Sequence, residues 1–410
     1  MGVLNIVGMG YIGLPTALMF AANDIDVVGT DINKILVEKL NDEILSFEEE
    51  GLKDLFKKAK EKSKIKFTTQ YCATDKYIVA VPTPYVKETK KVDLTYVKKA
   101  IEGILDKCLK GAIIVIESTI SPGSIENDIY AVIQKRGFIL GKDINIVHAP
   151  ERIIPGNMIY ELENNSRIIG SDEKLVGEKI KKLYESFCKG EIIITSIKVA
   201  EMCKVVENTF RDINIAFANE IAQICNQENI NVYDVISIAN RHPRVNIMQP
   251  GPGVGGHCIS IDPWFLVGNY HSTARLIETA RSINDSMPQF IFGRIKEIMQ
   301  HNNITKYNRI GLYGLSYKEN VDDVRESPTL QLLEVMKKNG IENLKVYDPL
   351  VNREIVKQQY FNFNEFISCV DIVIIMVGHN EIKEKQELLK DKIIYDTRNV
   401  IKCGKKIYKI

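Results

Sequence analysis

Two short apolar runs with a helix-like segment between them make up the first thirty residues. The run VLNIVG at residues 3–8 ends in glycine, and IDVVGTD at residues 25–31 ends in an acid. The intervening LPTALMFAAN predicts a helix, so this stretch predicts a strand, a helix and a second strand. Further strand candidates, separated by charged helical segments, lie at 77–84, 112–119 and 145–151. The alternation predicts a parallel, doubly wound sheet.

The middle of the chain changes to a purely helical pattern before strands return. Residues 197–229 have apolar residues at helical spacing without glycine or proline, which predicts one long helix and a candidate subunit interface. Beyond residue 308 the strand pattern resumes in RIGLYG, NLKVYDP, VDIVIIMV and KIIYDT. We expect an α/β protein with two Rossmann-like, doubly wound domains joined by a long central helix. The expected domains are 1–196, a central helical and dimerisation segment at 197–300, and 301–410.

Composition narrows the class of protein. The 410 residues are 45% hydrophobic and 26% charged, an ordinary soluble balance. A net charge of +1 gives no electrostatic reason to expect nucleic acid or a membrane surface as partner. The chain has no run of roughly 18 apolar residues, and its start lacks the basic segment of a signal peptide. Eight scattered cysteines without CxxC pairs favour a reducing cytoplasm, and neither they nor the six histidines have metal-ligand spacing.

A glycine triplet follows the first predicted strand. Gly8, Gly10 and Gly13 form G-x-G-x-x-G at the head of a helix, and Asp31 closes the next strand. In this context glycines allow a tight turn and close approach to a pyrophosphate, while the acid binds a ribose diol. The plainer interpretation is that the glycines only pack helix on strand. We expect a dinucleotide site, and Asp31 favours NAD over NADP because a carboxylate repels a 2′-phosphate.

The C-terminal half partly repeats this arrangement. Gly314 and Asp348 correspond loosely to Gly8 and Asp31, but the glycine triplet is missing. A smaller phosphate-bearing ligand, bound differently, is therefore more plausible there than a second dinucleotide.

Two threonine-containing turns follow predicted strands. Thr83 lies in VPTP and Thr119 in ESTISPG, both at the carboxyl edge where open α/β sheets bind ligands. Ordinary turns with Thr or Ser as helix caps explain the same residues equally well.

The long predicted helix presents three polar residues on one face. Lys204, Asn208 and Arg211 are spaced by four and three residues, so they can point a cation, an amide and a guanidinium at one ligand. The alternative is a solvated stripe, which the nearby Glu201 supports.

Cys258 differs from the other cysteines in its surroundings. It follows glycines and prolines in PGPGVGGHCISIDPW, where backbone N–H groups can stabilise an anionic sulfur or an oxyanion. Asp262, four residues on, can orient a lysine or a water, or simply cap a turn. The neighbouring His257 gives no basis for a Cys/His pair.

Taken together, these motifs resemble the UDP-sugar 6-dehydrogenases, NAD-dependent enzymes that oxidise a nucleotide sugar twice, from alcohol to carboxylate. The pieces occur in the family's order: GMGYIG, VPTP, EST, APER, EMCKVVENTFRDINIAFANE, GPGVGGHCISIDPW and YGLSYKENVDDVRESP. The segments ANRHPRVNIMQPGPGVGGHC and APERIIPGN resemble the branch that acts on UDP-N-acetylmannosamine. UDP-glucose enzymes typically have Phe-Leu-Arg where this chain has Arg152, Ile153 and Ile154, which disfavours glucose.

The resemblance implies catalytic roles. Cys258 is the expected nucleophile that holds the aldehyde as a thiohemiacetal, which a second NAD oxidises to a thioester before hydrolysis. Lys204 is the expected acid/base or oxyanion partner near C6, with Asn208 beside it and Asp262 supporting Lys204 or the water.

The remaining implied roles concern hydrolysis and binding. Thr119 and Glu151 are expected to hold water or help hydrolysis. The expected sugar and diphosphate contacts are Arg152, Ile153, Lys204, Asn208, Arg211, Arg241, His242, Arg244, Gly253 and Lys318. The expected cofactor contacts are Gly8, Gly10, Tyr11, Ile12, Gly13, Asp31, Thr83, Thr119 and Arg325. A homodimer through the central helix is expected, with either Arg244 or Arg241 reaching across it.

Several alternatives stay open at this point. UDP-glucose or UDP-N-acetylglucosamine can replace the mannosamine sugar as substrate. A two-electron 3-hydroxyacid or sugar-phosphate dehydrogenase needs neither Cys258 nor the C-terminal half. A nonenzymatic nucleotide-sugar sensor predicts ligand binding without NADH formation, although Cys258, Lys204 and Asp262 are all present.

Overall fold

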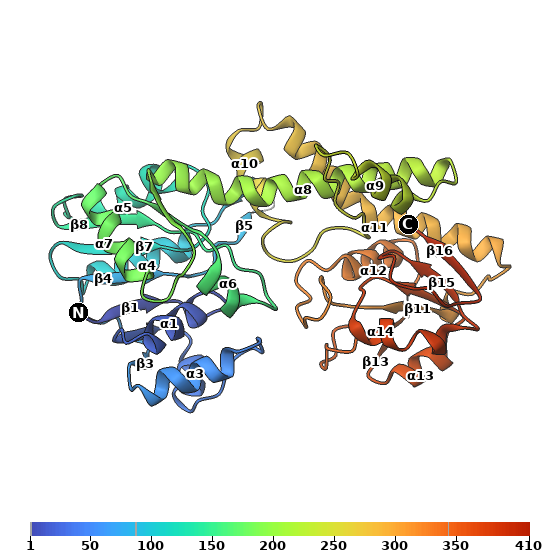
Figure 1. The fold of residues 1–410 in the computed structure, drawn as a ribbon, viewed down its shortest axis with the longest axis horizontal. Helices are drawn as coiled ribbons and strands as arrows, with labels where there is room; N and C mark the ends of the chain where they lie inside the picture. Colours follow the sequence, from blue (N-terminus) through green and yellow to red (C-terminus); the bar gives the residue numbers. More distant parts are fainter. Residues whose placement is uncertain (1, 87, 343) are drawn as a thin grey trace. The chain divides into compact units, whose positions relative to one another are not determined.

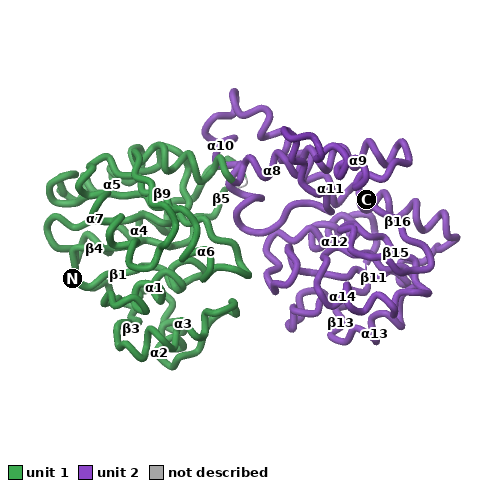
Figure 2. The backbone as a smooth tube through the Cα atoms, viewed as in Figure 1, with its two compact units in different colours: residues 1–207 green, residues 208–410 purple. Residues whose placement is uncertain are grey.

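A computed structural model describes residues 2–86, 88–342 and 344–410 (Figure 1). The chain folds into two compact units, Met1–Glu207 and Asn208–Ile410 (Figure 2). Each unit contains a sheet with helices, and the long helix α8 (Ile197–Gln227) runs from one unit into the other. The expected α/β class, with two Rossmann-like halves and a long central helix, is confirmed. The division into three domains stays a prediction.

The first unit contains an eight-stranded sheet in the order β10-β9-β8-β7-β4-β1-β2-β3. All strand pairings in this sheet are parallel except the one between β8 and β9, which is antiparallel. The edge strands β9 and β10 are parallel to each other and therefore run opposite to the other six strands. The strands are β1 (Leu4–Val7), β2 (Val27–Thr30), β3 (Ile65–Thr68), β4 (Lys76–Val79), β7 (Ala112–Ile116), β8 (Ile144–His148), β9 (Arg167–Gly170) and β10 (Ile192–Thr195). A separate hairpin joins β5 (Tyr85–Val86) and β6 (Lys91–Val92).

Helices cover both faces of this sheet. On β4, Ile78 packs into a core with α1, α2, α3, α6 and α7, whereas the adjacent Tyr77 packs into a core with α4 and α5. Alternate residues of one strand therefore face two cores, which explains why the strands read as continuous apolar runs. The helices are α1 (Gly13–Ala22), α2 (Lys34–Asn41), α3 (Leu52–Glu61), α4 (Thr95–Leu105), π-helical η1 (Ile125–Ile129), α5 (Tyr130–Lys135), α6 (Met158–Asn164) and α7 (Lys174–Tyr184).

The second unit contains a six-stranded, all-parallel sheet in the order β13-β12-β11-β14-β15-β16. This is the same order as β3-β2-β1-β4-β7-β8 of the first sheet, so the two halves repeat one topology. In both, the strand order reverses beside the first strand, which is where open α/β sheets bind ligands. The strands are β11 (Ile310–Tyr313), β12 (Lys345–Tyr347), β13 (Gln359–Tyr360), β14 (Ile372–Ile375), β15 (Ile393–Asp396) and β16 (Lys406–Lys409).

Helices also cover both faces of the second sheet. Ile374 of β14 joins a core with α8, α9, α11 and α12, and the neighbouring Val373 joins one with α13. The helices are α9 (Val232–Ala239), α10 (Asp262–Asn269), α11 (Arg275–His301), η2 (Tyr307–Arg309), α12 (Pro328–Lys338), α13 (Phe363–Ser368), α14 (Asn380–Glu384) and η3 (Gln386–Leu389).

Among the described residues, no helix combines the length and apolar character that crossing a bilayer requires. All eight cysteines lie in the described part of the chain, and each carries a thiol rather than a disulfide.

Candidate functional site

The glycine triplet occupies the turn from β1 to α1. Gly8 has φ +94°, and a Cβ there would lie 2.6 Å from the Ala80 carbonyl oxygen. A Cβ on Gly13 would lie 1.8 Å from the Gly8 oxygen, so these two glycines allow the close packing of helix on strand. Gly10 is different, because its Cβ position meets nothing within 4 Å. Its exposed backbone is the surface that a pyrophosphate can approach.

Asp31 lies beside this turn at the end of β2. Its Oδ2 accepts the Met9 N–H at 2.8 Å and its Oδ1 accepts the Asn33 N–H at 2.8 Å. A carboxylate has about four acceptor positions, so two remain for a ribose diol. The first turn of α1 has no acidic residue, and the positive end of the helix dipole suits a pyrophosphate. These residues fit NAD, and the half-buried Tyr11 beside them stacks on Phe47 with ring centroids 4.3 Å apart.

Three of the predicted site residues lie just beyond the carboxyl ends of neighbouring strands. Thr83 follows β4, Thr119 follows β7, and Glu151 follows β8, and these three strands are adjacent in the sheet. The first two turns are tied together, because the Ser118 hydroxyl donates to the Val81 oxygen at 2.7 Å. Thr83 and Glu151 are buried and Thr119 is half-buried. The edge of the sheet therefore brings these predicted site residues into one region of the first unit.

The loop that contains Arg152 is held by acidic side chains. The Arg152 guanidinium forms an ion pair with Glu207 and contacts Ser166. Farther along, the N–H groups of Gly156 and Met158 both donate to Glu49 at 2.8 Å. Arg152 is thus already paired with a carboxylate, and its expected role in sugar binding stays a prediction, as does that of the buried Ile153.

The polar face of α8 is buried, contrary to the alternative of a solvated stripe. Lys204 is 6% exposed and Asn208 is 7% exposed, while Arg211 is half-buried. Glu201 is also buried and accepts the N–H groups of Gly123 and Ile125 at 2.6 and 2.9 Å. Burial raises the pKa of Glu201 even though these two backbone donors lower it.

Cys258 is exposed in a turn that leads into α10. Its carbonyl oxygen accepts the N–H groups of Ile261 and Asp262 at 3.1 and 2.8 Å. The buried Asp262 carboxylate accepts a hydrogen bond from the Asn208 amide at 2.6 Å. Three of the predicted catalytic residues are therefore connected within the second unit, with Asn208 linking α8 to the turn that carries the thiol.

The glycines before Cys258 allow this loop to pack closely on the segment after β11. A Cβ on Gly256, which has φ +83°, would lie 2.7 Å from the Tyr317 ring. A Cβ on Gly255 would lie 2.5 Å from the Glu326 oxygen, and Gly253 has φ +133° beside Pro328. The Gly256 N–H also donates to the Arg325 oxygen at 2.9 Å. The loop needs glycine for its own packing, in addition to any approach to a substrate.

Arg241, His242 and Arg244 lie in the exposed turn after α9. The Nδ1 of His242 accepts the Arg244 N–H at 3.3 Å, which is a contact within the turn. The structure does not group these three residues with Cys258, and their expected substrate contacts stay predictions.

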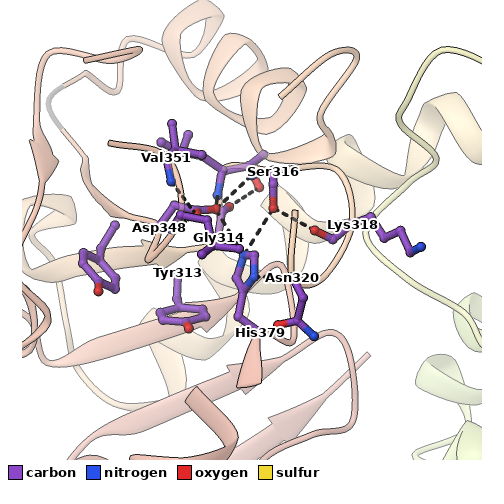
Figure 3. Close-up of polar contacts among 12 residues, drawn as sticks. Tyr313, Gly314, Ser316, Lys318, Asn320, Asp348, Val351 and His379 are labelled. Atoms are coloured by element: carbon purple, nitrogen blue, oxygen red, sulfur yellow. Dashed lines mark hydrogen bonds and ion pairs between the residues drawn. The ribbon is translucent and has the colours of Figure 1, made fainter. Parts of the chain in front are cut away.

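In the second unit, Asp348 occupies the place that Asp31 has in the first. Oδ2 of Asp348 accepts the Leu315 and Ser316 N–H groups at 2.7 and 3.0 Å, and Oδ1 accepts those of Leu350 and Val351 at 2.8 and 3.1 Å. His379 makes a fifth contact at 3.2 Å (Figure 3). All acceptor positions are used, so Asp348 has none left for a ribose diol. This supports the interpretation that the C-terminal half binds its ligand differently.

His379 takes a defined tautomer in this cluster. The Asn320 N–H donates to Nδ1 at 3.0 Å, so the proton of the neutral ring is on Nε2, which faces Asp348 and Ser316. Burial raises the pKa of Asp348, but hydrogen bonds from His379 and the backbone outweigh it and the net pKa is lowered. The Lys318 ammonium points away from the cluster, while its carbonyl oxygen accepts the Ser316 hydroxyl at 2.8 Å (Figure 3).

Arg325, an expected cofactor contact, forms a two-pronged ion pair with Asp323. Among the described residues, no group of three or more His, Cys, Asp or Glu side chains could hold a metal ion.

The sequence patterns did not predict the polar side chains that hold the site residues in place. Glu117, Arg167 and Tyr184 form a fully buried cluster around Glu151, and His379 and Tyr317 hold the second unit's loops. Only two weak sequence signals pointed to this cluster. Glu117 is the first residue of the EST motif, and Arg167 starts an otherwise apolar strand.

Comparison with known proteins identifies the family. Three models of the UDP-glucose/GDP-mannose dehydrogenase family match in order: the NAD binding domain at residues 3–188, the central domain at 198–286 and the UDP binding domain at 311–403. A UDP-N-acetyl-D-mannosamine dehydrogenase of Methanocaldococcus jannaschii is 42% identical over 98% of this chain and 95% of its own. An NDP-N-acetyl-D-galactosaminuronic acid dehydrogenase of Ralstonia solanacearum is 38% identical over 97% and 96%.

A solved structure agrees with these relatives. The UDP-N-acetyl-mannosamine dehydrogenase Cap5O from Staphylococcus aureus superimposes with a TM-score of 0.88 at 41% identity, covering 99% of this chain and 98% of that one. The resemblance noted from the motifs is therefore confirmed. The chain belongs to the UDP-glucose/GDP-mannose dehydrogenase family, with its NAD-binding, central and UDP-binding parts in that order.

Proposed function

We propose that this NAD-dependent dehydrogenase oxidises UDP-N-acetyl-D-mannosamine at C6 to UDP-N-acetyl-D-mannosaminuronate. The observation that carries the proposal is the similarity, at 41–42% identity over nearly the whole length, to proteins named as dehydrogenases of that sugar. The Arg152-Ile153-Ile154 sequence, which replaces the pattern expected for UDP-glucose enzymes, supports the same substrate.

The proposed chemistry requires the sugar to be held covalently on Cys258, first as a thiohemiacetal and then as a thioester. Bound NAD supplies the hydride acceptor for both oxidations. The Cys258 thiol adds to the C6 aldehyde to give a thiohemiacetal, whose oxidation leaves a thioester. Water then adds to the thioester carbonyl, the carbon–sulfur bond breaks, and the carboxylate and the thiol are released. The exposure of Cys258 on a turn supports its access to substrate.

The other proposed roles concern protons and orientation. Lys204 assists proton transfer or stabilises the oxyanion near C6, and Asn208 with Asp262 holds the turn beside Cys258. Their support is the 2.6 Å Asn208–Asp262 hydrogen bond and the burial of Lys204. Thr119 and Glu151 act in hydrolysis, for which their place at the carboxyl edge of the first sheet is the support.

A comparison of substrates tests the assignment. We would measure kcat/KM by NADH formation with UDP-N-acetylmannosamine, UDP-N-acetylglucosamine, UDP-N-acetylgalactosamine and UDP-glucose. The proposal expects the mannosamine sugar to exceed the others by at least about 10-fold, because a misplaced hydroxyl or acetamido group leaves buried polar groups unpaired. Preference for the galactosamine sugar would favour a second candidate function, the oxidation of that sugar. The 38% identical Ralstonia relative supports this candidate. Binding of a sugar without NADH would support the sensor alternative.

We also propose that the chain forms a homodimer through α8. Six exposed apolar side chains follow one stripe of this helix, namely Val199, Met202, Val206, Phe210, Phe217 and Ile224. At about 100° per residue they span roughly 80° of arc, opposite the face of Lys204, Asn208 and Arg211. A long exposed apolar stripe is typical of a subunit interface.

The oligomeric state of one variant tests the dimer. Phe210 is 63% exposed, and Phe210→Glu would place a charge within the stripe. Light scattering after gel filtration is expected to show a dimer for the unmodified chain and monomer for the variant. Phe361→Glu is the matched control, because Phe361 is 58% exposed away from α8 and should not change the mass. A monomeric unmodified chain would contradict the proposal.

A further inference from the structure

A buried charged cluster surrounds Glu151 in the first unit, and it combines side chains from four segments. Glu117 follows β7, Glu151 follows β8, Arg167 begins β9 and Tyr184 ends α7. Their side chains are at most 7% exposed, and Glu117 and Tyr184 are fully buried. Such a cluster costs desolvation energy, and replacing it by apolar residues often stabilises a protein. Its presence therefore calls for a reason other than stability.

Arg167 bridges the two carboxylates. Its Nη2 donates to Glu151 Oε2, and its Nη1 lies 3.3 Å from Glu117 Oε1. The guanidinium carbon lies 4.2 Å from the centroid of the Tyr184 ring, so the cation also stacks on an aromatic face. The Tyr184 hydroxyl in turn donates to Glu117 Oε1 at 2.6 Å. Glu117 and the Tyr184 ring thus fix the Arg167 guanidinium in the position from which it contacts Glu151.

Glu151 has both of its oxygens directed by this arrangement. Oε1 accepts the backbone N–H of Arg152 at 2.7 Å, while Oε2 accepts the Arg167 guanidinium. One donor is backbone and the other is a rigid planar group, so the orientation of the carboxylate plane is defined. A carboxylate fixed in this way still has acceptor positions free for a water molecule.

We propose that Arg167 is the positioning residue for Glu151 in the hydrolytic step, with Glu117 and Tyr184 forming the frame that holds its guanidinium. The inference rests on the proposed function, because it takes the hydrolytic role of Glu151 from there. In that step water adds to the thioester carbonyl, its proton passes to the Glu151 carboxylate, and the sulfur leaves as the Cys258 thiolate. Arg167 touches neither substrate nor thiol and acts only through Glu151.

The protonation state of the cluster agrees with a frame of this kind. Burial raises the pKa of Glu117 to about 7, although Arg167 opposes the shift. Burial alone would lower the pKa of Arg167, but Glu151, and after it Tyr184 and Glu117, outweigh this and keep the guanidinium charged. Burial also raises the pKa of Tyr184, so its hydroxyl remains a donor. Below about pH 7 Glu117 therefore keeps its proton, while Arg167 remains a cation.

The test separates hydrolysis from the two oxidations. In rapid mixing with excess NAD and UDP-N-acetylmannosamine, a variant that only slows hydrolysis releases two NADH per active site in a burst and then turns over slowly. Arg167→Lys keeps a buried cation, so the variant is expected to fold, but one ammonium cannot reproduce the planar fork. We expect a full burst and a steady-state rate lower by roughly 100-fold, the cost typical of a misplaced catalytic group.

Intact-protein mass spectrometry and two further variants complete the test. With Arg167→Lys the thioester adduct should accumulate, and Cys258 should carry it. Glu117→Gln keeps an acceptor for Arg167 and Tyr184, so its steady-state rate should stay within about 5-fold of the unmodified enzyme. Arg136→Lys is the matched control, because Arg136 forms an exposed ion pair with Asp106 and should change neither burst nor rate.

The possible outcomes are distinct. A burst and a steady-state rate that fall together in Arg167→Lys would overturn the positioning role, since a general structural effect reduces both. Unchanged kinetics in Arg167→Lys would overturn it as well. If the unmodified enzyme forms fewer than two NADH per sugar, the proposed function itself is wrong. That result comes from the unmodified enzyme alone and does not depend on the Arg167→Lys variant.

Discussion

Replacing Glu117 by glutamine should make the pH dependence of stability in the first unit flatter. Burial raises the pKa of Glu117 from 4.5 to about 7, and the side chain is fully buried, so solvent does not weaken the effect. Between these pH values the unfolded chain loses this proton while the folded chain keeps it. The folded state then binds more protons, so the stability of the unmodified protein falls as pH rises through this window.

The magnitude follows from the same values. At about 1.4 kcal/mol for each tenfold change, a rise from 4.5 to about 7 corresponds to roughly 3 kcal/mol. Glutamine does not titrate, so the stability of the variant relative to the unmodified protein should increase by about that amount between pH 4.5 and pH 8. Any constant effect of the amide shifts the whole curve and leaves this change intact.

The assay must report on the first unit alone. The chain has one tryptophan, Trp264, which lies in the second unit, so tryptophan fluorescence does not follow the unfolding of the first. Hydrogen exchange of peptides covering β7, measured from pH 5 to 8 and corrected for the intrinsic rate, reports opening of the correct sheet. The protection ratio of variant to unmodified protein should rise by on the order of 100-fold across the full window. A ratio that is independent of pH, or that falls, would refute the assignment of a buried, protonated Glu117.

Three further substitutions probe other parts of the site. Lys204→Ala should lower kcat by about 100-fold, the usual contribution of a proton-transfer group, while calorimetry still detects UDP binding; lost UDP binding would argue against a catalytic role. Gly256→Ala should reduce turnover, because the added Cβ would lie 2.7 Å from the Tyr317 ring. Gly111→Ala is the control: Gly111 has a similar positive φ but open space around its Cβ position, so this variant should keep full activity. Equal losses of activity in the two variants would contradict the packing argument. Asp31→Ala should raise KM for NAD about 10-fold through the lost diol contacts and leave KM for the sugar unchanged, as steady-state kinetics can show.

Local patterns were sufficient to predict most of the fold. The runs at residues 3–8 and 25–31 became β1 and β2, and the helix predicted for 197–229 is α8 at Ile197–Gln227. Apolar periodicity depends on nearby residues, so it can be read directly. The reversed direction of β9 relative to β8 depends on which strand edge the chain reaches, and no local residue encodes it.

The candidate site was predicted less completely, because its polar partners are distant in sequence. Cys258 and Asp262 stood out through an unusual run of glycines and a short spacing. Arg167 contacts Glu117 from fifty residues away, and His379 contacts Asp348 from thirty-one residues away. Such pairs form only when the topology brings two strand ends together, so composition and spacing did not indicate them.

The central claim is that one active site removes four electrons from one sugar through a thioester on Cys258. The most direct measurement is the number of NADH molecules formed per molecule of limiting UDP-N-acetylmannosamine, with the unmodified enzyme and with Cys258→Ser. The account predicts two NADH for the unmodified enzyme and failure of the variant to complete the second oxidation. One NADH for the unmodified enzyme, or two for the Cys258→Ser variant at an undiminished rate, would contradict it.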